Sequence, residues 1–419
     1  MRIRDWDRNL KVRLFGEALI NLTFWMFFPF LTIYFTEAFG KGLAGLMLIV
    51  SQLFSVAANL LGGFYADRFG RKRMMVIAAA GQGVSFFLFA LANSPWYQSA
   101  LVSFICFSAA GVFGAFYYPA SQAMVADVVE EKDRSSVFAV FYTSINIAVV
   151  LGPILGGIFY VSYKFELLLA AGASCLAVAL MLWKWTRETA APFKPEKAGS
   201  SWMKVLSEQL GSYSVILRDR TFLLFIVAGI LIAQTFMQLD LLLPVYIKEV
   251  LSQSTLFSWG GFDLKLNGEQ LFGLVLSENG LIVAAFTVFV TNWMSKYREK
   301  HVFILSSVVY GISILLFGLL AGPWGIIVAM ALFSFAELMT AGIQQSFISK
   351  LAPEHMRGQY FAAASLRNTI GRTIAPLSIP LTMWIGFTGT FVALAALAIL
   401  SAVLFGAMFR RMEREASGS

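Results

Sequence analysis

Residues 63–73 read Gly-Phe-Tyr-Ala-Asp-Arg-Phe-Gly-Arg-Lys-Arg, and long apolar runs lie on both sides of them. Four cations fall within the six residues 68–73. Because so much charge is not stable in hydrocarbon, the segment predicts a short loop at the cytoplasmic face of a membrane. Asp67 is suited to accept hydrogen bonds from the first N–H groups of another helix, and Arg71 to pair with Asp127. The alternative is a solvated loop that only satisfies membrane topology.

The composition is that of a membrane protein. The chain has 419 residues, of which 58% are hydrophobic and only 13% charged, with a mean hydropathy of +0.73. A soluble protein carries about 25% charged residues. A spanning helix needs about 20 mainly apolar residues. We expect twelve such helices, at residues 14–36, 43–65, 74–93, 98–120, 137–160, 165–186, 221–246, 271–293, 302–321, 325–349, 361–385 and 387–408. The sequence therefore predicts an all-α polytopic membrane protein.

The formal net charge of +8 is explained by topology. With the amino terminus placed in the cytoplasm, 26 of the 32 Lys and Arg fall in cytoplasmic segments and four outside, while Arg367 and Arg372 lie within a predicted helix. This asymmetry is the positive-inside pattern. It predicts a multi-pass protein of the cell (inner) membrane with both termini in the cytoplasm, and it gives no reason to expect a nucleic-acid partner.

One long polar interruption on the cytoplasmic side divides the apolar runs into six and six. We therefore expect an amino-terminal six-helix bundle at 1–186, a linker at 187–220 and a second six-helix bundle at 221–419. Within the linker, Trp202, Val205, Leu206 and Leu210 recur at helical spacing, which predicts either an amphipathic surface helix or a linker packed on a bundle. The external loop 248–270 alternates aromatic and polar residues around glycines and predicts a small β-hairpin.

The glycine, Ala-Asp-Arg and basic residues of 63–73 resemble the loop between helices 2 and 3 of the major facilitator superfamily. That superfamily consists of secondary transporters that move small solutes by alternating access between two six-helix bundles. The resemblance implies that this loop clamps the two bundles on the cytoplasmic side when the transporter faces outward. The clamp residues that it implies are Gly63, Asp67, Arg68, Gly70, Arg71 and Asp127.

A second motif lies in the predicted helix 137–160, where residues 152–157 read Gly-Pro-Ile-Leu-Gly-Gly. Ala148, Gly152 and Gly156 are spaced by four and form a stripe of small residues for close helix contact. Pro153 removes one backbone donor and bends the helix. The motif, with Gly157, resembles the signature of drug/proton antiporters in this superfamily, where it marks exporters rather than symporters. A generic packing stripe is the alternative.

Four candidate functional acids fall within the predicted helices. A charged carboxylate at mid-bilayer costs roughly 2.5–3.5 kcal/mol, so each is expected to pair with a cation or to stay protonated. Glu337 is the best candidate for a functional acid, because it shares a helix face with Ser334 and Gln344. We expect that face to line an aqueous cavity.

Asp240 lies about 10 Å from the outer end of its predicted helix at 1.5 Å per residue, and Pro244 frees its backbone carbonyl. Glu278 lies at a similar depth, and Glu17 near the cytoplasmic end of 14–36 is expected to extend to the membrane surface. Arg367 and Arg372 are the natural counter-charges. A structural ion pair with one of them is the alternative role for each acid.

Several segments resemble multidrug/proton antiporters of this family along nearly the whole chain. They are Phe236 to Asp240, Leu243-Pro244-Val245, Ala336-Glu337 and the loop from Phe257 to Gly268. The resemblance implies that Asp240 and Glu337 serve proton coupling and cation recognition. Phe141 stands where such chains carry an acid, and the predicted helix 98–120 lacks the arginine common in drug antiporters. These departures leave the proton stoichiometry and the substrate charge open.

The sequence thus predicts a proton-coupled secondary transporter that exports lipophilic, cationic compounds. Asp240, Glu337 and Glu278 are the predicted proton-coupling and substrate residues. A flippase or exporter of lipid-like amphiphiles is the alternative, followed by a proton-coupled nutrient symporter. We expect a monomer in contact with membrane lipids, with no cofactor, catalytic residue or metal site and with H⁺ as coupling ion. Both histidines, His301 and His355, lie in predicted loops, which argues against an intramembrane enzyme. The alternative of a non-transporting receptor built on the fold would be separated from a carrier by flux measurements.

Overall fold

The computed structural model describes residues 3–189, 219–259, 262–320, 322–341, 343–351 and 357–417. Nine of the helices in these ranges are long and apolar enough to cross a membrane. Three of the nine are long enough to cross twice, and each contains one non-helical residue, at Gly40, Tyr163 or Gly386. The described chain therefore makes twelve crossings, and the predicted all-α polytopic fold is confirmed.

The chain divides into two compact units. The first comprises Met1–Phe39 and Val50–Leu206, and the second comprises Gly40–Ile49 and Ser207–Ser419. The predicted linker at 187–220 lies mostly outside the described residues, and so does the helix expected around Trp202. The two units are described separately below.

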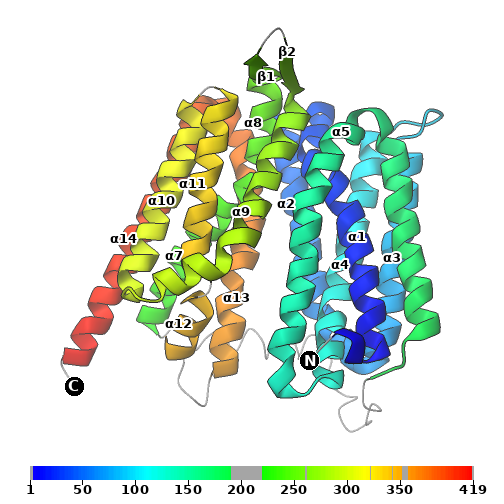
Figure 1. Cartoon of the computed structure of the whole chain (residues 1–419), viewed down its shortest axis with the longest axis horizontal. Helices are drawn as coiled ribbons and strands as arrows, with labels where there is room; N and C mark the ends of the chain where they lie inside the picture. Colours follow the sequence, from blue (N-terminus) through cyan, green and yellow to red (C-terminus); the bar gives the residue numbers. More distant parts are fainter. Residues whose placement is uncertain are drawn as a thin grey trace. The chain divides into compact units, whose positions relative to one another are not determined.

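The first unit is built from long helices (Figure 1). After a 3₁₀ turn, η1 (Ile3–Asp5), helix α1 (Arg8–Phe27) begins where Asp7 accepts a hydrogen bond from the Asn9 N–H at 2.8 Å. The unit continues with η2 (Phe28–Phe30), α2 (Leu31–Phe69), α3 (Arg71–Leu91), α4 (Ala100–Val128) and α5 (Glu131–Trp185), except that Gly40–Ile49 of α2 belong to the second unit. Helix α5 packs against both α1 and α3, and α3 packs against α4.

The junction between α2 and α3 depends on Gly70. Its φ of +99° lies in a region that side chains with a Cβ rarely adopt. The Glu188 carboxylate accepts hydrogen bonds from the N–H groups of Arg71 at 2.7 Å and Lys72 at 3.3 Å, so it caps the start of α3. A Cβ at Gly70 would lie 2.3 Å from a Glu188 oxygen. Glycine is therefore required both for the turn and for the cap.

The second unit contains two interrupted helices. Its elements are α7 (Arg220–Phe236), η4 (Met237–Leu239), α8 (Leu242–Val250), α9 (Gly268–Met294), α10 (Glu299–Leu319), α11 (Pro323–Ala341), α12 (Ile343–Leu351), α13 (Arg357–Ile374), η6 (Ala375–Leu377) and α14 (Ser378–Ser417). Helix α7 packs against α13 and α14, while α11 packs against α9 and α10. A sequence-based reading had expected one continuous helix at 221–246. The structure instead interrupts it at η4, and Pro244 lies beyond the break, within α8.

The predicted β-hairpin is present, and its location outside the cell stays a prediction. Strands β1 (Gln253–Trp259) and β2 (Phe262–Asn267) pair antiparallel, with Gln253 opposite Asn267. Asn267 then starts α9 with a capping box, because it exchanges hydrogen bonds with Gln270. Within the second unit, Figure 1 shows the hairpin at the end opposite to α12.

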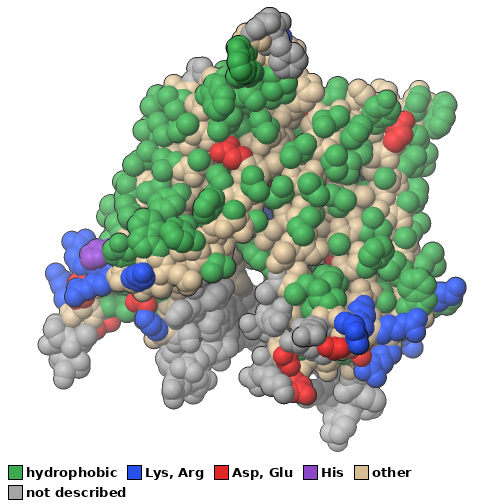
Figure 2. All heavy atoms as spheres, in the orientation of Figure 1, with side chains coloured by type: hydrophobic (Ala, Val, Ile, Leu, Met, Phe, Trp, Pro, Cys, Tyr) green, Lys and Arg blue, Asp and Glu red, His purple; other side chains and the backbone are tan. Residues whose placement is uncertain are grey.

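The surfaces of the units fit a bilayer. Figure 2 shows hydrophobic side chains over the flanks of the described helices, with Lys and Arg side chains gathered at one end of each unit. Helices with apolar flanks and charged ends are stable when lipid surrounds the flanks and water the ends. The chain is therefore a multi-pass membrane protein.

Candidate functional site

Glu337 in the second unit is held by uncharged donors. Asn279 on α9 donates from its amide nitrogen to Glu337 Oε2 at 3.1 Å and to Ser334 Oγ at 2.9 Å. Ser334 in turn donates to the carbonyl of Met330 at 2.9 Å, and it is fully buried. We call Asn279, Ser334 and Glu337 the α9–α11 cluster. Gln344, predicted on the same face, lies on the next element, α12.

The α9–α11 cluster contains no cation. Within the described part of the chain, neither Glu337 nor Glu278 forms an ion pair. The structural ion pair considered as an alternative role for these two acids is therefore absent from the described residues. Glu278 precedes Asn279 on α9 and is half-buried. A single formal charge on Glu337 can therefore be compensated only by a proton or by a cation from outside the cluster.

Asp240 lies at a break between helices. It follows η4 and precedes α8, and its N–H donates to the carbonyl of Met237 at 3.3 Å. Its side chain is half-buried. The pairing of Asp240 with Arg372 stays a prediction.

The break beside Asp240 is joined to a second break by Gln238. The Gln238 amide nitrogen donates to the carbonyls of Gln234 at 2.9 Å and Ala375 at 3.3 Å. Ser378 donates to the Gln238 side-chain oxygen at 2.6 Å. Gln238 is fully buried and satisfies carbonyls that the interrupted helices α7 and α13 leave open.

Arg367 is not the counter-charge that the sequence predicted. It is buried, with 3% of its surface exposed, and its guanidinium carbon lies 4.4 Å from the centre of the Phe225 ring. Its Nε donates to the carbonyl of Ala364 at 2.8 Å, and its stem packs against Gly229. No described carboxylate pairs with it. The physical reason is packing: the absence of a Cβ at Gly229 lets the arginine lie against α7, where a cation–π contact replaces an ion pair.

The first unit contains a polar cluster that the sequence did not indicate. Arg13 on α1 is only 1% exposed, and its Nε donates to Glu17 Oε1 at 2.9 Å. The same oxygen accepts from Tyr117 at 3.1 Å and from Ser121 at 2.9 Å, both on α4. Arg13 also donates to Ser121 and lies over the Phe141 ring at 4.7 Å. We call Arg13, Glu17, Tyr117 and Ser121 the α1–α4 cluster.

This cluster corrects the expectation for Glu17. Its carboxylate does not extend to the membrane surface, because hydrogen bonds from Arg13, Tyr117 and Ser121 within the bundle hold one of its oxygens. A signal was available in the sequence, since Arg13 and Glu17 are four residues apart and face each other on one helix. Phe141 contributes here as a ring beneath Arg13 rather than as an acid.

The predicted contact between Arg71 and Asp127 is present. Arg71 Nε lies 3.4 Å from Asp127 Oδ2, and Thr189 donates to the same oxygen at 2.9 Å. Arg71 also donates to the carbonyl of Ala66 at 2.9 Å, which ties the end of α2 to the start of α3. Arg68 is exposed beside Phe69, and the side chain of Asp67 lies outside the described residues. The role of these residues as a conformational clamp stays a prediction.

Of the two adjacent glycines near the end of α2, Gly62 makes the closer contact. A Cβ at Gly62 would meet Pro119 of α4 at 3.2 Å, whereas no described atom lies within 4 Å of a Cβ built at Gly63. Residues 62 and 63 point about 100° apart on a helix. The clamp role that the resemblance implies for Gly63 stays a prediction.

The small-residue stripe of α5 packs against α1. A Cβ at Gly152 would lie 2.5 Å from Trp25, and one at Gly156 would lie 2.2 Å from the carbonyl of Met26. Pro153 lies inside the helix, and Gly157 is buried. The generic packing function is thus present, and whether the motif also specifies antiport stays a prediction.

Comparisons with known proteins agree on the kind of molecule. The family model described as Major Facilitator Superfamily matches residues 14–264 and 255–419. A "Na(+), Li(+), K(+)/H(+) antiporter" of Planococcus maritimus is 56% identical over 418 residues, which cover 99% of each chain. The "Multidrug resistance protein MdtH" of Escherichia coli (strain SE11) is 22% identical, over 86% of this chain and 83% of that one. A crystal structure of a POT family transporter in complex with 5-aminolevulinic acid has a TM-score of 0.77 at 16% identity and covers 97% of each chain, a likeness of fold alone.

Proposed function

The chain belongs to the major facilitator superfamily, a family of transporters and not of enzymes, and from this premise we propose that it exchanges protons for monovalent metal cations. The observation that carries the proposal is the relative from Planococcus maritimus, which is named for exchange of Na⁺, Li⁺ and K⁺ against H⁺ and matches 99% of this chain at 56% identity. The earlier expectation of a drug exporter becomes the second candidate. In both cases the coupling ion is H⁺ and no other cofactor is proposed.

The α9–α11 cluster supplies suitable chemistry. Alkali cations are hard ions that prefer oxygen ligands, and the cluster offers the carboxylate of Glu337, the hydroxyl of Ser334 and the amide oxygen of Asn279. Because no arginine or lysine in the described ranges forms an ion pair with Glu337, its negative charge is available either to a proton or to a metal cation. A carboxylate that holds only one of these two ions at a time makes their binding mutually exclusive.

Mutual exclusion gives antiport by linkage. A cation that binds Glu337 from the cytoplasm requires the ionised carboxylate and so expels its proton there. After the transporter has changed the side to which it opens, a proton from outside displaces the cation. Asp240, in the break between η4 and α8, is proposed as a second titrating group. Glu278 is proposed as an additional acid on the ion path, and Arg71 with Asp127 as the clamp that stabilises one of the two states.

Export of lipophilic cations is a second candidate, supported by a specific feature of the first unit. One oxygen of Glu17 is held by the α1–α4 cluster, while 17% of its side chain remains exposed, beside the aromatic ring of Tyr117. A carboxylate next to aromatic rings suits a flat organic cation. The relative MdtH, named a multidrug resistance protein, supports the same candidate.

Everted membrane vesicles from cells that lack their own cation/proton antiporters test the proposal. Respiration acidifies the vesicle lumen, and quenching of acridine orange reports the pH difference. Addition of NaCl, LiCl or KCl is expected to restore the fluorescence when the protein is present, whereas choline chloride is not. If alkali salts have no effect while the vesicles accumulate ethidium, and a protonophore abolishes that accumulation, the second candidate replaces the first.

We also propose that the protein is a monomer of the cell membrane with both termini in the cytoplasm, which the distribution of Lys and Arg supports. Ser252 before the hairpin and Ser295 after α9 are both exposed, and the native Cys106 and Cys175 are buried. In intact cells a membrane-impermeant maleimide is expected to label Ser252→Cys and not Ser295→Cys. The reverse labelling would overturn the orientation.

A further inference from the structure

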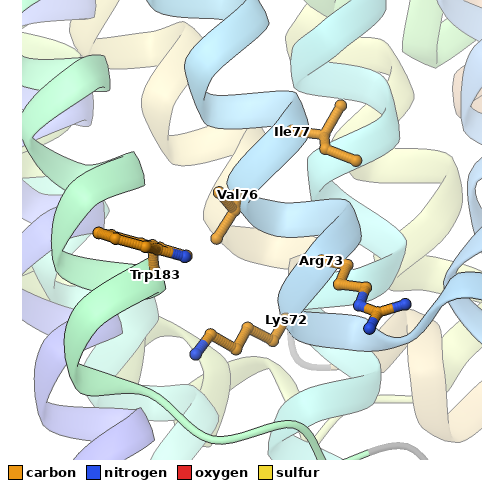
Figure 3. Close-up of a pocket in the computed structure, with 5 residues that line it drawn as sticks. All are labelled: Lys72, Arg73, Val76, Ile77 and Trp183. Atoms are coloured by element: carbon orange, nitrogen blue, oxygen red, sulfur yellow. The ribbon is translucent and has the colours of Figure 1, made fainter.

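A hollow of about 150 Å³ lies in the first unit, between the start of α3 and the end of α5. It is lined by Lys72, Arg73, Val76, Ile77 and Trp183 (Figure 3). Ile77 is 59% exposed and Trp183 is 62% exposed, although both lie on membrane-crossing helices. Large apolar side chains exposed at such positions are covered by lipid.

The polar ends of this hollow have a fixed arrangement. Lys72 donates to the carbonyl of Thr186 at 2.7 Å, so its ammonium group is held beneath the end of α5 with further hydrogens available. Figure 3 shows that this ammonium and the indole nitrogen of Trp183 face the same space between the two helices. Arg73 points to the other side of the first turn of α3. Two donors thus converge below an apolar wall formed by Val76 and Ile77.

The charge around the hollow is positive. Arg73 and Lys184 are both exposed, and they add to the charge of Lys72. The carboxylate of Glu188 accepts hydrogen bonds from the N–H groups of Arg71 and Lys72. A ligand that matches this site has a negatively charged phosphate beside an apolar chain.

We propose that this hollow, defined by Lys72, Val76, Ile77 and Trp183, binds an anionic phospholipid. The phosphate accepts from the ammonium of Lys72 and from the indole N–H of Trp183, while an acyl chain lies along Val76 and Ile77. Arg73 attracts the negatively charged headgroup over a longer range. The membrane covers this surface in any case, and the two converging donors distinguish the site from ordinary lipid contact. The proposal does not depend on which ion the protein transports.

Native mass spectrometry of protein released from nanodiscs tests the site. The nanodiscs contain equal amounts of phosphatidylglycerol and phosphatidylcholine with the same acyl chains. The wild-type protein is expected to retain phosphatidylglycerol in preference. Lys72→Gln is expected to lower that preference by about fivefold, which corresponds to about 1 kcal/mol for one basic residue near an anionic headgroup. Trp183→Phe keeps an aromatic ring but removes the indole N–H. It is expected to lower the preference for phosphatidylglycerol by a smaller factor.

The second unit offers a matched control. Lys296 lines a different hollow with Phe289, Asn292 and Trp293, and it is also exposed. Lys296→Gln removes one charge and is expected to leave the preference unchanged. The proposal is overturned if Lys296→Gln has the same effect as Lys72→Gln, because the attraction is then a general property of the basic surface. It is also overturned if soluble glycerol phosphate, which lacks acyl chains, displaces the lipid.

Discussion

Glu17 in the first unit and Glu337 in the second are both carboxyl groups on membrane-crossing helices, and their partners differ in charge. Glu17 accepts from the guanidinium of Arg13 and from two hydroxyl groups. Glu337 accepts from the amide of Asn279, and its described surroundings contain no ion-pair partner. The first carboxylate is thus neutralised within the protein, whereas the second requires an ion from outside it.

This difference indicates that the two units have different roles. An arginine four residues away on the same helix holds its carboxylate permanently, because the guanidinium is always charged. Such a pair stabilises the bundle, and its carboxylate does not change its charge state. A carboxylate with only neutral partners changes its charge state whenever its ion leaves. The structure therefore favours the second unit as the site of ion exchange and the first unit as its framework.

The variant Glu337→Gln gives the strongest test of the difference between Glu337 and Glu17. We expect this change to abolish cation-dependent proton movement. The neutral amide of glutamine does not take up the proton and offers the cation no negative charge. The measurement is recovery of acridine orange fluorescence in everted vesicles, across a range of pH. Since protons and cations compete for one carboxylate, wild-type exchange should require more cation at lower pH. Glu166→Gln, which alters an exposed carboxyl group on α5, serves as control. If Glu337→Gln exchanges ions at the wild-type rate, the coupling carboxyl group would be Asp240 and not Glu337.

Arg13→Met tests the framework role of the first unit. Removal of one partner of a buried ion pair leaves the other charge uncompensated and costs roughly 3–5 kcal/mol of stability. We expect a large loss of thermal stability in detergent, measured by tryptophan fluorescence. The double variant Arg13→Met with Glu17→Gln should recover most of it. Arg8→Met, which changes an exposed arginine on the same helix, should have little effect. An unaltered melting temperature in Arg13→Met would show that the pair does not support the bundle.

Asn279→Ala probes the neutral partner of Glu337. A hydrogen bond to a charged group contributes about 1.5–3 kcal/mol, so the apparent cation affinity should fall by about tenfold or more. The half-maximal cation concentration in the vesicle assay measures this change. Asn292→Ala on the same helix affects an exposed amide and should leave that concentration unchanged. Equal effects from the two variants would remove Asn279 from the site.

The smallest expected effect concerns the contact between Arg71 and Asp127. Partly exposed ion pairs contribute about 0–1 kcal/mol, so Arg71→Ala should lower turnover by no more than about fivefold and leave cation affinity intact. Exchange of the two charges should restore turnover only in part, because Arg71 also donates to Ala66 and Asp127 accepts from Thr189. Initial rates at saturating cation separate turnover from affinity. Wild-type rates in each single variant would reduce the motif to a signal for membrane topology.

Some features of the site were accessible from the sequence and others were not. The contact between Arg71 and Asp127 was predicted, because each residue lies at the end of an apolar run and therefore at the membrane surface. From the sequence, Pro244 predicted only a free backbone carbonyl at Asp240 and not the helix break beside that residue. Arg367 was predicted to pair with an acidic residue only because of its charge. Its position beside Phe225 depends on the space left by Gly229, which is far away in the sequence.

The sequence by itself determined the number of crossings, the β-hairpin and the family. These properties follow from local composition, since a backbone in lipid must satisfy its hydrogen bonds within helices and long apolar runs mark where it does so. Only the tertiary structure decided which partner each buried carboxyl group receives. Asn279 and Glu337 are 58 residues apart, and Tyr117 and Glu17 are 100 residues apart. The packing of whole helices brings such residues together, and no local pattern of residue types encodes that packing.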